Sequence, residues 1–279
     1  MPTVTRESRI VGALLGLHAG DALGATVEFQ SHGSIKAAYP PGHSSSSTTL
    51  GSITGGGAFR WPPGHATDDT DMTRGVLLAY LDCLTDAAHA HDDRLVAESL
   101  RISRITHDDA LCTVSCAVYN TIVAELVQGR GPDAAVDAGI RLCRKLEHAP
   151  PPPQDKKKTT TTPPPSVLGA LKLGTQLRLQ GLARFGPPPS AMPGQCSGYV
   201  LESLSVAVAA LLDPRCLEDV LVDVLRVGKD TDTNAAIAGG LLGARDGEDA
   251  IPRRWQDKLQ FGKEFRTMAT NIIRSQEER

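Results

Sequence analysis

This 279-residue chain has few aromatic side chains, no Cys-x-x-Cys pair, no long basic run and no long apolar run. Its apolar stretches fall short of the ~20 residues that cross a bilayer, so no membrane span is expected. The net charge is −3, without the clustered Lys and Arg that hold proteins on nucleic-acid phosphates. We interpret the six cysteines as reduced and mostly buried.

The same absences bear on where the protein works. The one candidate for a secretory leader is the apolar run 10–17, but it is short, Glu7 precedes it and Asp21 follows closely. We therefore expect a soluble monomer of a reducing compartment, cytoplasmic or nuclear, with no membrane partner and no direct nucleic-acid partner. Hydrophobic residues make up 41% of the chain, which supplies enough apolar surface for a core of ordinary size.

Apolar residues recur at helical spacing through most of the chain. Over residues 217–225 they fall at i, i+3, i+4, i+7 and i+8, and Gly228 is a natural stop for this helix. Residues 72–84 and 203–212 follow the same pattern. No alternation of β-branched and polar residues predicts a strand. The predicted fold class is therefore all-α.

Glycines at 12, 16, 20 and 24 recur every fourth residue near the start of the chain. In a helix they share one face, which another helix or a loop could approach closely at the backbone. Each glycine costs about 0.5–1 kcal/mol against alanine in a helix interior, so close packing is a plausible compensation. The alternative is a poor helix or a loop.

The segment 149–166 is rich in Pro, Lys and Thr and has no apolar periodicity, which predicts a flexible, solvated insertion. It could separate two domains. We favour a surface loop inside one domain spanning 1–279, because two acidic clusters on opposite sides of it complement each other. Two further long loops are predicted at 43–57 and 186–198.

The two clusters are "GHATDDTDM", residues 64–72, and "GKDTDTNAA", residues 228–236. Both contain Asp-Thr-Asp and both precede a run of small or apolar residues. Helix capping explains one such side chain, but crowding three carboxylates into one turn creates repulsion that a cap does not require. A cation would remove the repulsion, and carboxylate and hydroxyl oxygens favour Mg²⁺, Mn²⁺ or Ca²⁺ over Zn²⁺.

An EF-hand loop starting at Asp230 is excluded, because its sixth position is Ala235 and its twelfth is Leu241. The better hypothesis joins the two clusters in space around two ions, an arrangement that clamps attacking and leaving oxygens in hydrolysis.

Four segments, 12–29, 64–72, 197–211 and 228–244, resemble in order the signature segments of the ADP-ribosylglycohydrolases, the family of dinitrogenase reductase-activating glycohydrolase and the animal ADP-ribosylhydrolases. The resemblance spans about the whole chain. It implies a single compact, orthogonal helical bundle with a binuclear site for two Mg²⁺ ions, or Mn²⁺ in their place. It also implies an enzyme that hydrolyses the anomeric bond of an ADP-ribose conjugate and releases ADP-ribose.

Carried over residue by residue, the resemblance implies six metal ligands: Thr67, Asp68, Asp69, Asp230, Asp232 and Thr233. It gives Asp71 no ligand role. Glu28 stands where similar enzymes carry a glutamate on a mobile active-site loop, and it could orient the attacking water or take its proton. Without the resemblance, Glu28 would be interpreted as a solvated charge at a helix end.

The implied substrate-binding residues are His107, Ser197, Gly198 and Tyr199. His107 lies in a Thr-His segment that reaches the nucleotide in similar proteins, and the tyrosine of "SGY" lines their adenosine pocket. The alternatives are an N-cap at Thr106, with Asp109 at the third helical position, and a core role for Tyr199.

The chain departs from the family's pattern before His107, where many relatives carry an Asn-Gly-Ser-x-x-Arg-like segment and this chain has "VAESLRISRITH". The departure leaves open whether the conjugate carries arginine, serine, poly(ADP-ribose), an acetyl ester or a phosphate. Two rival functions also stay open: a non-catalytic relative, as in a lens crystallin of this fold, and a metal-dependent phosphatase.

Overall fold

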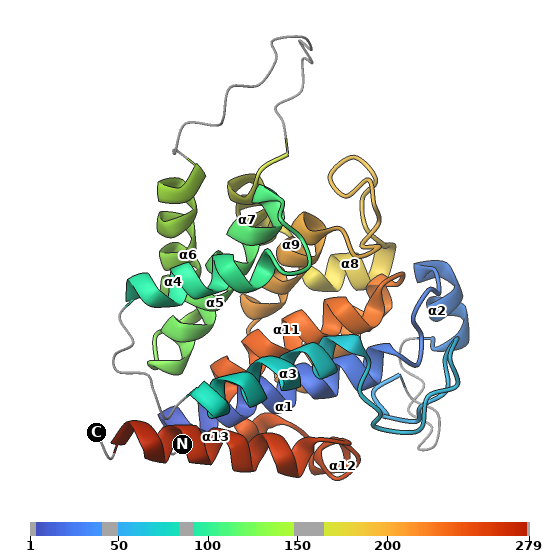
Figure 1. Cartoon of the computed structure of the whole chain (residues 1–279). Helices are drawn as coiled ribbons and strands as arrows, with labels where there is room; N and C mark the ends of the chain where they lie inside the picture. The colour runs from blue at the N-terminus through green and yellow to red at the C-terminus, as the bar shows by residue number, and fades with distance from the viewer. Residues whose placement is uncertain (1–3, 41–49, 84–91, 148–164, 278–279) are drawn as a thin grey trace.

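The computed structural model describes residues 4–40, 50–83, 92–147 and 165–277. These residues fold into helices joined by loops, and their only strand-like pairing is one antiparallel bridge between Gly56 and Trp61 (Figure 1). The all-α prediction is confirmed. The helices are α1 (Arg6–Gly24), α2 (His32–Ala38), α3 (Asp68–Cys83), α4 (Asp92–Ser103), α5 (Ala110–Val127), α6 (Pro132–Glu147), α7 (Val167–Gln176), α8 (Leu179–Phe185), α9 (Val200–Leu211), α10 (Leu217–Val227), α11 (Thr231–Asp246), α12 (Arg253–Gln256), α13 (Gly262–Glu277) and a 3₁₀ turn, η1 (Glu248–Ala250).

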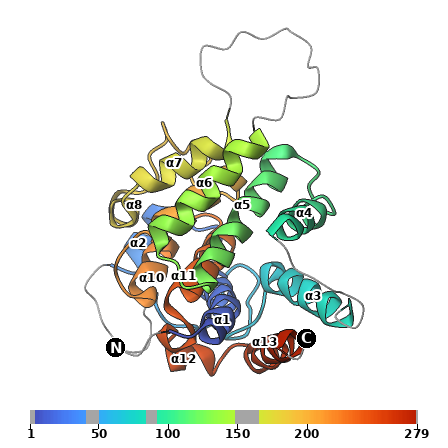
Figure 2. The same ribbon diagram turned by 90° about the vertical axis from the view of Figure 1, so that its left-hand side faces the viewer.

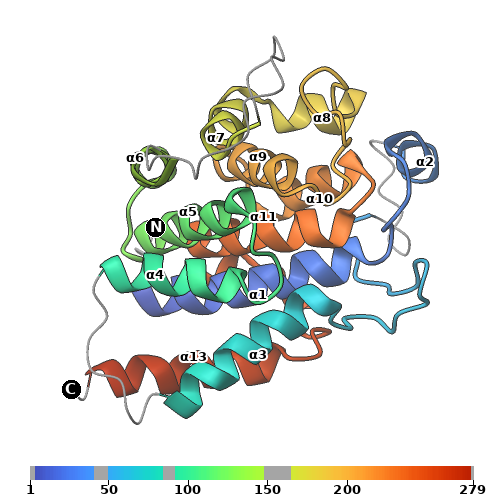
Figure 3. The ribbon, with the colours of Figure 1, turned by 45° about the horizontal axis from the view of Figure 1, so that its top comes forward.

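Helices α1 and α11 run side by side through the middle of the molecule. In Figure 3, α9 and α10 lie on one side of this pair and α3 and α13 on the other, so the helices form stacked layers. Helix α11 contributes Ala235 and Leu242 to the larger apolar core and Leu241 and Ala244 to the smaller one. Because both cores hold α11, its first turn is fixed in place.

The glycine face predicted on α1 is confirmed, and its partner is α11. A Cβ added to Gly16 would lie 2.3 Å from the carbonyl oxygen of Gly239, and one added to Gly20 would lie 2.0 Å from that of Ala235. The same holds in reverse, since a Cβ on Gly239 would lie 2.1 Å from the oxygen of Gly16. The two backbones are therefore in direct contact, which only glycine allows.

Helix α10 confirms the amphipathic stripe over 217–225. Leu217, Val220, Leu221, Val224 and Leu225 are all fully buried, and each such side chain contributes about 1.5–3 kcal/mol through burial. The helix ends at Gly228, as predicted. Gly228 has φ +89°, and a Cβ there would lie 2.6 Å from the backbone nitrogen of His32. Helix α10 therefore ends here because both the positive φ of Gly228 and the nearby backbone of His32 require glycine.

Helix α5 (Figure 2) is the one helix in the described part of the chain that is long and apolar enough to cross a membrane. Its Val118, Ile122 and Leu126 are fully buried in the smaller core, packed with residues of α6 and α9. One face of α5 therefore packs into the smaller core, while 33% of its residues are buried.

Three predictions of detail need comment. The insertion predicted at 149–166 lies outside the described residues except for its last two positions, and the loop predicted at 43–57 is described only from residue 50. The loop predicted at 186–198 is confirmed. The N-cap predicted at Thr106 is wrong: Asp109 caps α5 by accepting a 2.8 Å hydrogen bond from the Leu111 N–H, while the Thr106 hydroxyl is directed to Ser103.

Five of the six cysteines have described side chains, and all five are free thiols. The prediction that they are mostly buried is wrong, because only Cys143 and Cys196 are buried and Cys216 is exposed. Cys216 is the N-cap residue of α10 and is exposed, whereas Leu217, the first residue of the helix, is buried.

Candidate active site

The two acidic clusters meet in space. Helix α3 begins at Asp68 and α11 begins at Thr231, so each cluster occupies the first turn of a helix, where backbone N–H groups favour negative charge. The Thr233 hydroxyl of the second cluster donates a 3.1 Å hydrogen bond to Oδ2 of Asp69 in the first. The hypothesis that the clusters join across 163 intervening positions of the chain is confirmed.

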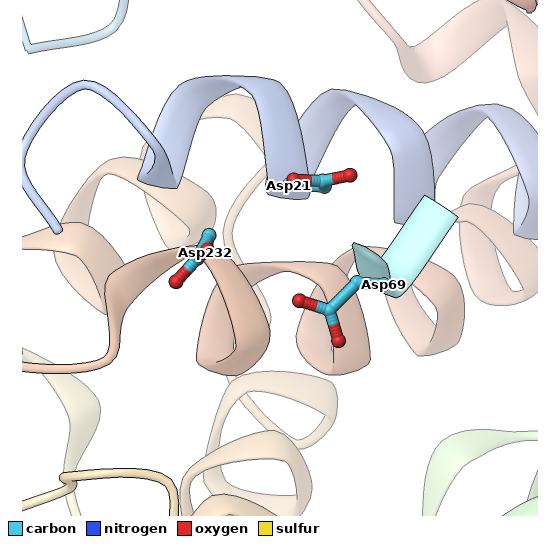
Figure 4. Close-up of side chains that lie close together, drawn as sticks. All are labelled: Asp21, Asp69 and Asp232. Atoms are coloured by element: carbon cyan, nitrogen blue, oxygen red, sulfur yellow. The ribbon is translucent and has the colours of Figure 1, made fainter. Parts of the chain in front are cut away.

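A third carboxylate, which the sequence analysis missed, joins them. Asp21 of α1, Asp69 of α3 and Asp232 of α11 each offer an oxygen, and these oxygens lie within 4.8 Å of one another (Figure 4). Asp21 is fully buried. The signal that could have revealed it is the one carboxylate of the stretch 10–24, which otherwise consists of glycine, apolar residues and His18, since a buried carboxylate requires partners.

Hydrogen bonds hold one of the two oxygens of the Asp21 carboxylate. Its Oδ2 accepts a 3.0 Å hydrogen bond from the Thr67 N–H and a second from the Thr70 hydroxyl. Nδ1 of His18 lies 3.4 Å from the same hydroxyl, and Nε2 of His18 accepts from the Phe261 N–H at 3.2 Å. Because Nε2 is an acceptor, the proton of the neutral ring is on Nδ1, and burial lowers the pKa of His18 to about 4.

Three oxygens beside this network are buried and have no hydrogen-bond partner among the described residues: Oδ1 of Asp21, Oγ1 of Thr67 and Oδ1 of Asp232. Buried polar atoms without a partner are uncommon in folded proteins and require an explanation. Two of them belong to the carboxylate group in Figure 4, and the third belongs to Thr67, two positions before Asp69 in the chain. A divalent cation would satisfy all three, and the oxygen-only ligand set suits Mg²⁺ or Mn²⁺.

The pKa values of these carboxyl groups also indicate that a positive charge is needed here. Burial, followed by neighbouring carboxylates, raises the pKa of Asp69 to about 7. Burial and the adjacent Asp230 raise the pKa of Asp232 to about 8, and burial raises that of Asp21. A bound cation would favour the ionised form of each group and reverse these shifts.

A pocket of about 460 Å³ opens onto the cluster. It contains six residues expected at the site, together with Phe29 and Lys229; the eight are Glu28, Phe29, Asp68, Ser197, Lys229, Asp230, Asp232 and Thr233. Thr67 is buried and Asp69 is half-buried, and neither lines this pocket. Asp71, for which no ligand role was expected, is exposed.

Glu28 is held at the pocket by backbone hydrogen bonds. The Phe29 N–H donates to the carbonyl of Lys229, and the Lys229 N–H donates to the carbonyl of Gln30, both at 2.7 Å. This pairing ties the loop after α1 to the turn before α11. Burial, then Asp230 and Asp68, raise the pKa of Glu28 to about 7. A carboxyl group with that pKa can both accept and release a proton near neutral pH.

The loop before α9 reaches the pocket through Ser197, and Glu202 organises it. The buried carboxylate of Glu202 accepts 2.7 Å hydrogen bonds from the N–H groups of Gly194 and Cys196. Gly198 has φ +87°, and a Cβ there would lie 2.2 Å from Oδ2 of Asp230. Glycine is therefore required where this loop passes the second acidic cluster. Sequence analysis identified Ser197 and Gly198 but not Glu202.

Three expected substrate-binding residues lie outside the pocket lining: Gly198, whose position is given above, Tyr199 and His107. Tyr199 precedes α9 and its side chain is 41% exposed, so its alternative role as a core residue is excluded. His107 is exposed in the turn between α4 and α5. The structure does not bring His107 to the pocket, and the substrate-binding roles of all three residues stay predictions.

Comparison with known proteins agrees with this geometry. The family model described as ADP-ribosylglycohydrolase matches residues 2–92 and 83–279. The chain is 24% identical to ADP-ribosyl-[dinitrogen reductase] glycohydrolase of Rhodospirillum rubrum, with 91% of each protein covered. It is 26% identical to ADP-ribosylarginine hydrolase Tri1 of Serratia proteamaculans, over 94% of this chain and 78% of that protein.

A solved structure described as "ADP-ribosylglycohydrolase-related protein complex" superposes with a TM-score of 0.63 at 22% identity, covering 97% of this chain and 98% of that one. Its likeness establishes the fold. The family model covers nearly the whole chain, including both acidic clusters and the pocket between them. The chain belongs to the ADP-ribosylglycohydrolase family, a family of hydrolases.

Proposed function

We propose that this protein is a divalent-metal-dependent hydrolase that cleaves the anomeric bond of an ADP-ribose conjugate, with arginine as the leaving group. The observation that carries the proposal is the meeting of two acidic clusters, with buried unpartnered oxygens, at a pocket that also holds Glu28. A site built only for stability would not crowd four carboxylates into one pocket.

The proposed metal site uses Thr67, Asp68, Asp69, Asp230, Asp232 and Thr233 for two Mg²⁺ ions, with Mn²⁺ as the alternative. The unpartnered Thr67 and Asp232 oxygens support this assignment, and Asp21 adds a buried oxygen of its own. Bound divalent ions at such a site orient a ribose hydroxyl and lower the pKa of water.

Glu28 is the proposed proton-transfer group. Its carboxyl group lines the pocket, and its pKa of about 7 suits either direction of transfer at neutral pH. As a carboxylate it would take the proton of the attacking water. As an acid it would return a proton to the leaving nitrogen, which completes the hydrolysis without a net change in Glu28.

The pocket composition supports a cationic leaving group. Glu28 and the aromatic ring of Phe29 line the pocket, and neither is assigned to the two ions. A guanidinium group suits both, through charge and through contact with a ring face. The relatives named for ADP-ribosylarginine and for ADP-ribosyl-dinitrogen reductase are consistent with this choice. Lys229, the one cation of the lining, is placed to meet a phosphate of ADP-ribose.

The test is product analysis with ADP-ribosyl-arginine as substrate. We expect release of intact ADP-ribose and arginine with Mg²⁺, loss of activity with excess chelator, and a fall of about 100-fold or more in kcat for Glu28→Gln. Release of phosphate in place of ADP-ribose would identify a phosphatase instead. Calorimetric binding of ADP-ribose without turnover of any conjugate would identify a non-catalytic relative.

A further inference from the structure

A row of aromatic side chains leads away from the candidate pocket over the surface. The aromatic row consists of Phe29, Phe59, Trp61 and His65. Ring centroids are 6.0 Å apart between Phe29 and Phe59, 5.7 Å between Phe59 and Trp61, and 4.6 Å between Trp61 and His65, whose rings are stacked. The four rings are thus in sequential contact, with Phe29 and Phe59 exposed and Trp61 and His65 half-buried.

The two phenylalanines of the row are exposed in a chain that has few aromatic residues. Phe, Trp and Tyr make up 4% of the sequence, yet the side chains of Phe29 and Phe59 are each 61% exposed. Two adjoining phenylalanines at this exposure contribute little to the core and leave apolar area in water. Contiguous exposed apolar groups mark binding surfaces, and aromatic residues are enriched among those that dominate binding energy.

The row is rigid because the loop that carries it is fixed to the protein. Gly56 and Trp61 exchange two backbone hydrogen bonds of 2.8 Å, which close a tight turn with Phe59 near its tip. At the base of the turn, a Cβ on Gly57 would lie 2.0 Å from the carbonyl oxygen of Ala25. The turn therefore rests directly on the segment that leads to Glu28. A surface held in this way loses little conformational freedom when a partner binds.

The row begins inside the pocket and ends outside it. Phe29 lines the pocket and follows Glu28 in the chain, whereas Phe59, Trp61 and His65 are absent from the lining. A small conjugate that fills the pocket can reach Phe29. Only a substrate that extends past the pocket mouth can also cover Phe59 and Trp61.

We propose that the aromatic row is the docking surface for the protein that carries the ADP-ribosylated side chain. The inference rests on the proposed function, since it assigns a macromolecular substrate to that site. The partner is a folded protein with an apolar patch beside the modified arginine. When that patch covers the row, the modified side chain enters the pocket past Phe29, next to Glu28.

The test compares one chemical linkage on large and small carriers. The substrates are a folded protein ADP-ribosylated on arginine, its tryptic digest, and ADP-ribosyl-agmatine. For Phe59→Ala we expect kcat/KM to fall about ten-fold on the intact protein and to change by less than about two-fold on ADP-ribosyl-agmatine, since Phe59 does not line the pocket. The digest should behave like the small substrate.

Phe185→Ala is the matched control, because Phe185 of α8 is 75% exposed and does not line the pocket. It should leave kcat/KM unchanged on all three substrates, and Phe59→Tyr should restore turnover of the intact protein. Thermal melting of each variant shows whether the fold is intact.

Three results would overturn the inference. Equal losses for Phe59→Ala on large and small substrates would place Phe59 in the chemistry of the small conjugate, and no loss on either would leave the row without a partner. In both cases the wild-type protein still hydrolyses the agmatine conjugate, so the proposed function stands. If the wild type hydrolyses none of the three substrates, the proposed function fails together with the inference.

Discussion

Helices α1 and α11 are in contact along their length, and the two ends of this contact differ in their chemistry. From Gly12 to Gly20 the contact is backbone on backbone, with no side chain between the helices. At the other end the same helices bring Asp21 and Asp232 together, and those carboxylates repel each other. The two parts are linked, since a Cβ on Gly24 would lie 2.3 Å from Cα of Asp232. Glycine packing therefore sets the distance between the two carboxylates. The stability that this packing contributes offsets the repulsion between them.

The largest effect is expected when the glycine contact between α1 and α11 is disrupted. Gly16→Val adds a Cβ that would lie 2.3 Å from a backbone oxygen of α11, so the helices must separate and the carboxylate spacing is lost with them. We expect insoluble protein, or a Tm lowered by about 15 °C or more. Gly75→Ala on α3 is the control, because a Cβ there has no neighbour within 4 Å and alanine favours the helix. A Gly16→Val protein that melts like wild type in circular dichroism would contradict the packing argument.

The second prediction concerns Asp232, whose replacement should raise the stability of the metal-free protein and lower its affinity for metal. Asp232→Asn removes a charge whose burial is unfavourable without a cation, so we expect a higher Tm in chelator than for wild type. Calorimetry should show Mg²⁺ affinity weakened by about 100-fold or more. Asp71→Asn is the control, because Asp71 of the other acidic cluster, in the first turn of α3, is exposed and outside the pocket, and it should change the affinity little. Equal Mg²⁺ affinities of Asp232→Asn and wild type would refute the assigned metal site.

The third effect concerns the groups that hold Asp21 in place. Thr70→Val keeps the shape of a buried side chain and removes the hydroxyl that joins His18 to Asp21. We expect Mn²⁺ affinity to fall about ten-fold, and Thr70→Ser to restore most of it. Thr121→Val is the control, because its hydroxyl bonds only to the Ala117 carbonyl within α5. Unchanged Mn²⁺ affinity in Thr70→Val would show that the hydroxyl acts in folding alone.

The smallest effect is a pH dependence of the metal-free protein. Folding raises the pKa of Asp69 and Glu28 to about 7 and of Asp232 to about 8, so the native state binds more protons than the unfolded state near neutral pH. Stability in chelator should therefore decrease as pH rises from about 6.5 to about 8.5. The lowered pKa of His18 acts in the opposite direction, but only below the ordinary histidine pKa of 6.5.

Differential scanning fluorimetry in chelator checks this, with a Tm decrease of a few degrees expected across that range. Saturating Mg²⁺ should flatten the profile, because the ion stabilises the ionised carboxylates. A metal-free Tm that rises over the same range would contradict the assigned shifts.

The sequence predicted much of the fold because its signals were local. The apolar stripe of α10, the glycine spacing of α1 and the two Asp-Thr-Asp clusters are each visible within one short segment. Asp21 and His18 were missed because their roles depend on partners far along the chain, such as Phe261 for His18. Glu202 was missed although its partners Gly194 and Cys196 are close in the sequence, because the path of the irregular loop before α9 has no sequence pattern. The aromatic row was missed because Phe29 and Phe59 adjoin only after the turn at Gly57 rests on Ala25.

Helices α1 and α11, which form the glycine contact, are far apart in the sequence and are therefore synthesised at different times. Helix α1 leaves the ribosome first, yet the helix that covers its bare face ends at Asp246. At a synthesis rate of about 5–20 residues per second, the interval lasts roughly 10–45 s. During that time the glycine face of α1 is without α11, and Asp21 cannot join Asp232. The proposed metal site can therefore assemble only after α11 has been synthesised, so metal binding would report that translation has passed this helix.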